Sequence, residues 1–183
     1  NTVFMLVADE IDRVLPTIRS RCRLIRAGAP TREQALEWLK SQGVQDAERK
    51  LTEAGGMPLA VFDEDARFRL ADETRERFLA YLKLGHAAPP AQALSVADKD
   101  VTLSAAALFL SRWGWDLASA KVGCEPQYFP EFAEEIKTIA QAANPTGLYT
   151  WINSVRDIRR VSEHPLNAKT MIEALLISYA RNI

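Results

Sequence analysis

Four arginines stand close together near the start of the chain, and their side chains could do chemistry with a charged partner. They are Arg19, Arg21, Arg23 and Arg26. A guanidinium is planar and permanently charged, and it matches the geometry of phosphate and carboxylate groups. The simplest interpretation is a solvated basic edge, because exposed charges contribute little by themselves. A second interpretation is a nucleic-acid-binding cluster, whose affinity for DNA would fall with salt.

The sequence lacks the motifs of the common catalytic and metal sites. It has no phosphate-binding loop of the GxxxxGKS or GxxxxGKT form, no GxSxG elbow and no HExxH pair. Two cysteines, Cys22 and Cys124, lie far apart, and two histidines, His86 and His164, have no other ligand type at metal spacing. We therefore expect no metal, no disulfide, no cofactor and no catalysis by this chain alone. Cys22 is predicted to be a small buried hydrophobic residue, and the histidines to lie at the surface or at caps.

The element that precedes the arginines is predicted to be a buried strand. Residues 2–8 form a short apolar run rich in Val, Phe, Leu and Met, which is typical of the centre of a parallel sheet. An acidic loop follows at 9–12. A central strand needs neighbours on both sides, and apart from a brief alternation at 22–26 no similar run follows. We therefore expect the chain to begin inside a larger α/β domain.

From residue 28 onward the apolar spacing is helical. The segment 28–65 is predicted to hold three short helices, which Gly43 and Gly55 help to separate. In the segment 66–183, apolar residues recur every three or four positions in five longer stretches, which predicts a helical bundle. The expected fold is mainly α, after the end of an α/β core at 1–27. The predicted helices are 31–43, 47–54, 58–63, 66–85, 101–117, 132–143, 148–161 and 171–179.

The arginine segment resembles the end of the ATPase core in the AAA+ clamp-loader family. In that family the core ends with a strand, an acidic turn and a Thr-x-x-Ser-Arg-Cys motif. Thr17, Ser20, Arg21 and Cys22 match this motif in type and spacing. The resemblance implies that Arg21 reaches across a subunit interface to the γ-phosphate of ATP in the neighbouring subunit. There a guanidinium supplied in trans stabilises the charge of the transferring phosphoryl group.

A second stretch, 165–176, is similar to the last collar helix of the same family. The resemblance implies that 1–27 ends the AAA+ core, that 28–65 is the lid domain and that 66–183 is the collar, which joins the subunits of a pentamer. The implied partners are gamma or tau and delta subunits through the collar, and the sliding clamp and primed DNA through the whole complex. Apolar surface beyond the core of one bundle is then expected on two opposite faces of the collar.

Two departures from the family pattern indicate a subunit that does not hydrolyse ATP. Hydrolysing subunits carry a threonine or asparagine sensor at the end of the strand, where this chain has Val7-Ala8-Asp9. Pro58 stands where the lid arginine of the second sensor is expected. We therefore interpret the chain as part of a stator subunit that keeps only the trans-acting arginine. An ATP-active subunit of the gamma or tau type, and a free-standing helical nucleic-acid-binding module, remain as alternatives.

Aromatic and charged residues of the predicted bundle have simpler interpretations. Trp113 and Trp115 are expected to pack in the core or at a subunit interface, and Trp151 and Leu175 fall on core faces of their helices. The charges of 156–160 alternate with apolar residues, so they are expected to form the wet face of an amphipathic helix.

Composition excludes several classes of protein. The 183 residues are 48% hydrophobic and 26% charged, which excludes a disordered or low-complexity chain. The net charge of −1 argues against nonspecific nucleic-acid binding as the role of the whole chain. The longest apolar run, from Ala105 to Leu110, is far shorter than the ~20 residues that cross a bilayer. We therefore expect a cytoplasmic protein with no membrane partner.

Overall fold

The computed structural model divides into two compact units, Asn1–Thr31 and Arg32–Ile183. The residues that it describes are mainly helical, which confirms the predicted fold class. Within them, no helix is long and apolar enough to cross a membrane. The described residues are 2–8, 14–25, 28–62, 69–97, 100–162, 164 and 167–183.

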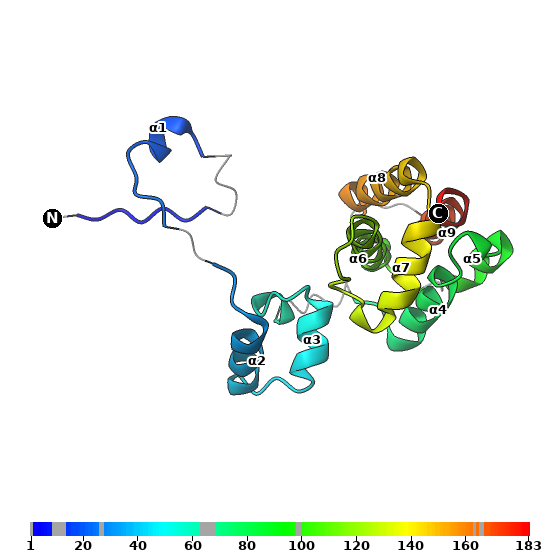
Figure 1. Cartoon of the computed structure of the whole chain (residues 1–183), viewed down its shortest axis with the longest axis horizontal. Helices are drawn as coiled ribbons and strands as arrows, with labels where there is room; N and C mark the ends of the chain where they lie inside the picture. Colours follow the sequence, from blue (N-terminus) through cyan, green and yellow to red (C-terminus); the bar gives the residue numbers. More distant parts are fainter. Residues whose placement is uncertain are drawn as a thin grey trace. The chain divides into compact units, whose positions relative to one another are not determined.

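The described residues of the first unit form one short helix, α1 (Pro16–Arg19), between irregular segments (Figure 1). The prediction of a buried strand at 2–8 is wrong for this structure, because these residues have no regular secondary structure. The side chains of Val3, Phe4 and Val7 are 85–89% exposed. A strand needs a partner for its backbone hydrogen bonds, and the described parts of the chain contain no second strand. The predicted acidic loop at 9–12 lies outside the described ranges.

The second unit begins with three short helices around a small core. They are α2 (Arg32–Ser41), α3 (Ala47–Glu53) and the 3-10 helix η2 (Leu59–Val61), which confirms three of the predicted helices. Gly55 and Gly56 follow α3 with φ of 64° and 79°, a left-handed backbone that favours glycine and ends a helix. The buried core residues of this part are Ala35, Leu39, Ala47 and Leu51.

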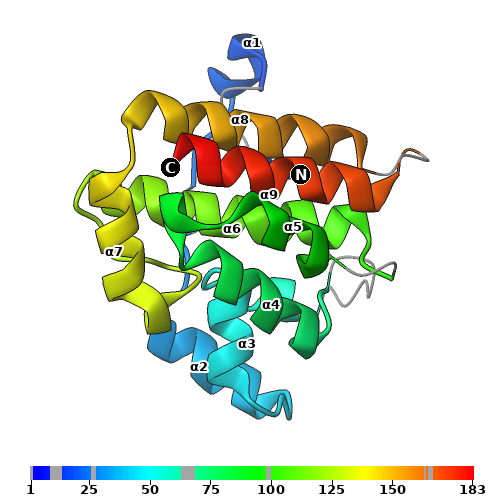
Figure 2. The ribbon, with the colours of Figure 1, turned by 90° about the vertical axis from the view of Figure 1, so that its right-hand side faces the viewer.

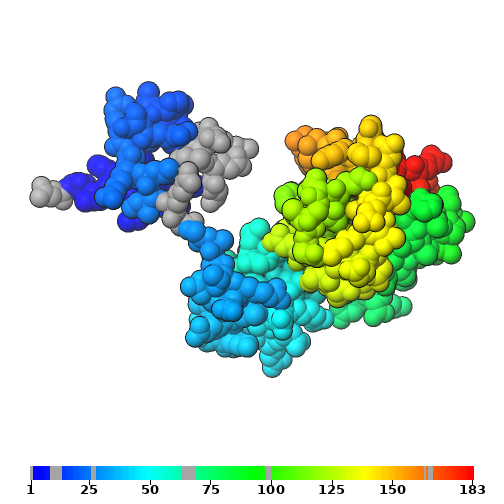
Figure 3. All heavy atoms as spheres, viewed as in Figure 1, coloured from blue at the N-terminus to red at the C-terminus, as the bar shows by residue number. Residues whose placement is uncertain are grey.

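The rest of the second unit is a helical bundle with one hydrophobic core. Helices α6, α8 and α9 lie side by side in it (Figure 2), and Figure 3 shows one face of its packed atoms. The α-helices are α4 (Asp72–Leu82), α5 (Pro90–Val96), α6 (Leu103–Lys121), α7 (Ala133–Ala142), α8 (Pro145–Val161) and α9 (Ala168–Asn182), with 3-10 helices η4 (Gly85–Ala87) and η5 (Pro130–Phe132) between them.

Helix α6 is the centre of the bundle. It contacts α7, α8 and α9, and Leu110, Trp113 and Leu117 are fully buried along it. A Cβ atom at Gly114 would lie 3.1 Å from the ring of Trp151, so a glycine at this position lets α8 approach closely. This close approach explains why the helix carries a glycine in its interior, where glycine otherwise costs about 1 kcal/mol.

Side-chain caps begin three of the bundle helices. Thr102 accepts a hydrogen bond from the backbone N–H of Ala105 before α6, and Asn167 accepts one from Thr170 before α9. Asn144 accepts hydrogen bonds from two N–H groups before α8, whose first residue is Pro145. Such caps satisfy backbone donors that have no partner inside the helix.

Candidate functional site

The predicted arginine motif lies on α1 and the turn that follows it. Pro16 opens this helix, and the side chains of Ser20 and Arg21 both donate to the backbone carbonyl of Thr17. The Nη1 atom of Arg21 donates to the Thr17 oxygen at 2.6 Å, and the Ser20 hydroxyl donates to the same oxygen at 3.2 Å. The turn therefore fixes one edge of the Arg21 guanidinium through its own backbone.

All four motif residues are exposed. For Cys22 this corrects the prediction of a buried hydrophobic residue, because no described residue of the first unit is buried and the unit offers no core. Arg23 is exposed as well, whereas Arg26 lies outside the described residues. An exposed guanidinium that is held by its own turn can present a cation to an anionic group of another molecule.

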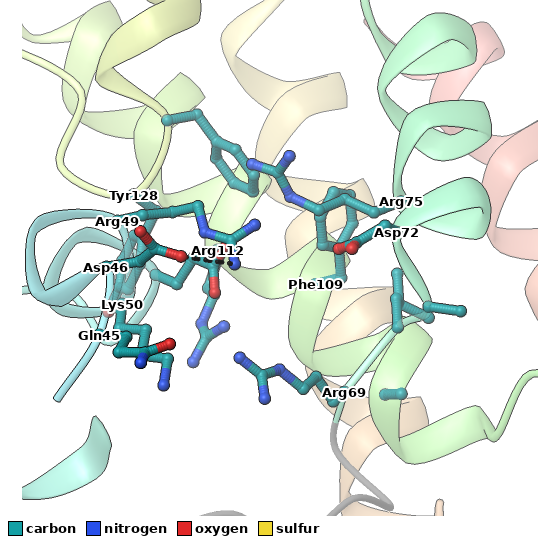
Figure 4. Close-up of a pocket in the computed structure, with 15 residues that line it drawn as sticks. Gln45, Asp46, Arg49, Lys50, Arg69, Asp72, Arg75, Phe109, Arg112 and Tyr128 are labelled. Atoms are coloured by element: carbon teal, nitrogen blue, oxygen red, sulfur yellow. Dashed lines mark ion pairs between the residues drawn. The ribbon is translucent and has the colours of Figure 1, made fainter. Parts of the chain in front are cut away.

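A second basic site lies in the second unit, between α3, the segment 69–75 and α6 (Figure 4). It is a cleft of about 490 Å³. Five cationic side chains line it, together with the rings of Tyr128 and Phe109. We call it the basic cleft, and its cations are Arg49, Lys50, Arg69, Arg75 and Arg112.

Arg75 and Arg49 each have an acidic partner in or beside the cleft. Arg75 is 3.1 Å from Glu131, and Arg49 is 4.0 Å from Asp46. Arg112 is different, because its guanidinium lies 5.6 Å from the ring centroid of Tyr128, where the face of the ring attracts a cation. Burial lowers the pKa of Arg112, and the nearby Tyr128 and Glu53 oppose that shift. The cleft thus holds one partly desolvated cation.

A buried carboxylate positions the loop that carries Tyr128. Asp116, on α6, is fully buried. Its oxygens accept hydrogen bonds from the backbone N–H groups of Gln127 (2.9 Å), Tyr128 (3.0 Å) and Phe129 (2.8 Å). Burial raises the pKa of Asp116, while these three bonds act in the opposite direction. The side chain of Gln127 then donates to the carbonyl of Gly55 at 2.5 Å, which ties the loop to the end of α3.

Sequence reasoning missed both the basic cleft and Asp116. The cleft is assembled from four segments that are distant in the chain, so no local motif predicts it. One feature of the sequence could have identified Asp116 as a buried residue. It lies three residues after Trp113 and one before Leu117, inside the apolar stripe of a long helix. A charged residue at such a position is rarely buried without partners.

The burial of the aromatic, charged and titratable residues can be read residue by residue. Trp113, Trp151 and Leu175 are buried, as predicted, whereas Trp115 is 58% exposed and packs in no core. The charges of 156–160 lie on the exposed face of α8, which confirms that prediction. Both histidines are exposed, and both cysteines are free. Among the described residues, no group of three His, Cys, Asp or Glu side chains could hold a metal ion.

Part of the chain is similar to a known protein. Over 66 residues it is 38% identical to "DNA polymerase III subunit delta'" of Haemophilus influenzae. The match includes 34% of this chain and spans 20% of the length of that relative. No protein-family model matches the chain, and no solved structure gives a match.

The structure also describes residues at the two places where the clamp-loader family carries its ATP sensors. Val7 and Ala8 are exposed, and Pro58 is half-buried just before η2. Neither an apolar side chain nor a proline ring carries a donor for phosphate. Asp9, the third residue of the first comparison, lies outside the described ranges.

Proposed function

We propose that this chain is part of the delta-prime subunit, the stator of a bacterial DNA polymerase III clamp loader. The observation that carries this proposal is the 38% identity over 66 residues to subunit delta'. The Thr-x-x-Ser-Arg-Cys motif at 17–22 also supports it, because it resembles the end of the AAA+ core in this family. In this assignment the chain works in the cytoplasm, in DNA replication.

Arg21 is the residue that acts on a neighbouring subunit. Its exposure and its hydrogen bond to the Thr17 carbonyl support a guanidinium that is presented outward from a fixed turn. Placed at the γ-phosphate of a neighbour's ATP, such a group would stabilise the charge that spreads over the phosphoryl oxygens. Ser20 would help to hold the turn, because its hydroxyl bonds the same carbonyl.

The chain itself would hydrolyse no ATP. Val7 and Ala8 offer no hydroxyl or amide to position a water, and Pro58 offers no guanidinium to a bound phosphate. A subunit that supplies a trans-acting arginine but lacks these groups serves as a stator. The alternative of a gamma or tau subunit requires ATP turnover by the protein that carries these residues, and a turnover assay distinguishes the two.

The helical bundle would be the collar that joins the subunits. Several large apolar side chains remain exposed on it, notably Leu94 on α5, Trp115 on α6 and Tyr149 on α8, each more than half exposed. Exposed apolar side chains of this size are available for burial at a protein interface. The partners would be gamma or tau and delta subunits, and through the whole complex the sliding clamp and primed DNA.

Size-exclusion chromatography with light scattering tests the assembly. The chain is mixed with the gamma or tau and delta subunits of the same source. We expect co-elution in one complex, and Trp115→Lys should weaken it because a charge would be buried at the contact. Glu135→Lys, at an exposed site on α7, is the control for a change of surface charge. A chain that elutes alone at micromolar concentrations would contradict the proposed assembly.

A further inference from the structure

The basic cleft concentrates positive charge from three segments of the chain. Lys50 comes from α3, Arg69 from the segment before α4 and Arg112 from the middle of α6. Figure 4 shows Lys50 on one side of the opening and Arg69 on the other. Cations that converge on one concave surface raise the local concentration of anions.

Acidic side chains also line the cleft, namely Asp46, Glu53 and Asp72. Two of the cations form ion pairs, Arg75 with Glu131 and Arg49 with Asp46. Lys50 and Arg112 form no ion pair with another described residue, so both remain able to bind an anion.

Arg112 is a partly desolvated cation in the wall of the cleft. It is partly desolvated and stacked on the ring of Tyr128, and the acidic group that favours its charge is the nearby Glu53. Holding a guanidinium in such a place costs free energy unless an anion approaches it. Its position is also fixed, because Asp116 anchors the backbone of Tyr128. A fixed cation at the wall of a cleft is preorganised for an oxyanion.

We propose that the basic cleft binds a small anion with two or more linked phosphate groups, held by Arg112 and Lys50, with Arg49 and Arg69 beside them. A cleft of about 490 Å³ is larger than one phosphate needs, and its cations are spread over three segments, which favours a chain of phosphates over a single one. The face of Tyr128 is covered by Arg112, so an aromatic base gains no stacking surface there. The site is independent of Arg21 and of the proposed function, since it lies entirely within the second unit.

Isothermal titration of the 183-residue chain with inorganic pyrophosphate, without magnesium and at low salt, tests the proposal. We expect one site per chain, with an affinity that falls as sodium chloride is added. Arg112→Gln and Lys50→Gln should each weaken binding about tenfold or more, since a charge-assisted hydrogen bond is lost. Orthophosphate should bind at least about tenfold more weakly than pyrophosphate, because it reaches fewer of the cations.

Arg160→Gln is the matched control. Arg160 is an exposed arginine on α8 that lies 3.7 Å from Asp157 and lines no part of the cleft, so its loss changes net charge equally. Lys50→Gln keeps the test independent of folding, because Lys50 lies on the surface of α3 rather than in the bundle core.

Three results would overturn the proposal. They are no saturable binding at millimolar pyrophosphate, an equal loss of affinity in Arg160→Gln and Lys50→Gln, or ADP binding much more tightly than pyrophosphate. The last result would assign the cleft to a nucleoside rather than to a phosphate chain.

Discussion

The indole nitrogen of Trp113 donates a hydrogen bond to the hydroxyl of Tyr179, 3.2 Å away, in the centre of the bundle. The same hydroxyl donates to the carbonyl of Leu82 at 2.7 Å. One buried oxygen therefore joins α6, α9 and the end of α4. Trp151 packs edge-on against the ring of Tyr179 with 4.9 Å between centroids, so the network is enclosed by aromatic surface. Buried polar networks of this kind are stable only when every member has a partner.

Removing this oxygen should destabilise the bundle. Tyr179→Phe leaves the Trp113 N–H without an acceptor and the Leu82 carbonyl without that donor, so the free energy of unfolding should fall by roughly 2–4 kcal/mol. Urea unfolding followed by tryptophan fluorescence measures the change. Tyr149→Phe, at an exposed tyrosine, should change stability by no more than about 0.5 kcal/mol. Equal unfolding midpoints for the two variants would show that the network contributes little.

The same tyrosine makes stability sensitive to alkali. Burial raises the pKa of Tyr179 far above the ordinary value of 10.0. Above about pH 10 the unfolded chain loses the phenol proton of Tyr179 while the folded chain keeps it. The free energy of unfolding therefore falls as pH rises, by up to about 1.4 kcal/mol per pH unit. Tyr179→Phe lacks this term, so its deficit relative to the wild type should shrink between about pH 9 and pH 11. A deficit that stays constant over this range would contradict the assignment.

Asp116 should be required for order in the 127–129 loop. Asp116→Ala removes the acceptor of three backbone N–H groups, so we expect a loss of roughly 2–4 kcal/mol and faster amide hydrogen exchange at these residues. Asp157→Ala, at an exposed site on α8, is the control. The variant should also bind pyrophosphate more weakly, although it removes a negative charge, because Tyr128 and Arg112 lose their fixed geometry. Unchanged amide hydrogen exchange at 127–129 would show that Asp116 is not required for order in this loop.

The core faces of α8 and α9 can be tested directly. Trp151 and Leu175 are buried, and the indole N–H of Trp151 donates to the Leu175 carbonyl at 3.0 Å. Truncation of either side chain to alanine should lower the free energy of unfolding by roughly 2–5 kcal/mol, by loss of apolar burial and by the cavity left behind. Trp115→Ala, which truncates an exposed indole, should leave the melting temperature of the isolated chain nearly unchanged. A similar loss in all three variants would mean that the faces are assigned wrongly.

The sequence predicted what local patterns can encode. Apolar spacing of three and four residues located four of the six bundle helices to within a few residues of the bounds in the structure, and the glycine pair at 55–56 marked the end of α3. Helix α5 was missed, since no helix was predicted between residues 85 and 101, although Pro90 occupies a first-turn position that a helix tolerates. The first helix of the bundle was expected to start earlier than Asp72, the first residue of α4.

What the sequence could not show depends on contacts between distant segments. The run at 2–8 has the composition of a strand, but a strand forms only when a neighbour supplies the other half of its hydrogen bonds. The basic cleft joins Lys50, Arg69 and Arg112, which share no motif. The role of Asp116 depends on a loop that returns to α6 eleven to thirteen residues later.

The central prediction is that Arg21 completes the ATP site of a neighbouring subunit. The direct measurement is the DNA-stimulated ATPase rate of a loader reconstituted with the subunit that carries this chain, as wild type, Arg21→Ala or Arg23→Ala. An arginine supplied in trans contributes ~10³–10⁵ in rate at its own site, and the loss in the whole complex will be smaller because other subunits supply arginines to the other sites. We expect a lower rate for Arg21→Ala with assembly intact, and a rate near wild type for Arg23→Ala, which lies outside the motif. Equal rates for Arg21→Ala and wild type in fully assembled complexes would contradict the claim and leave Arg21 as a surface charge.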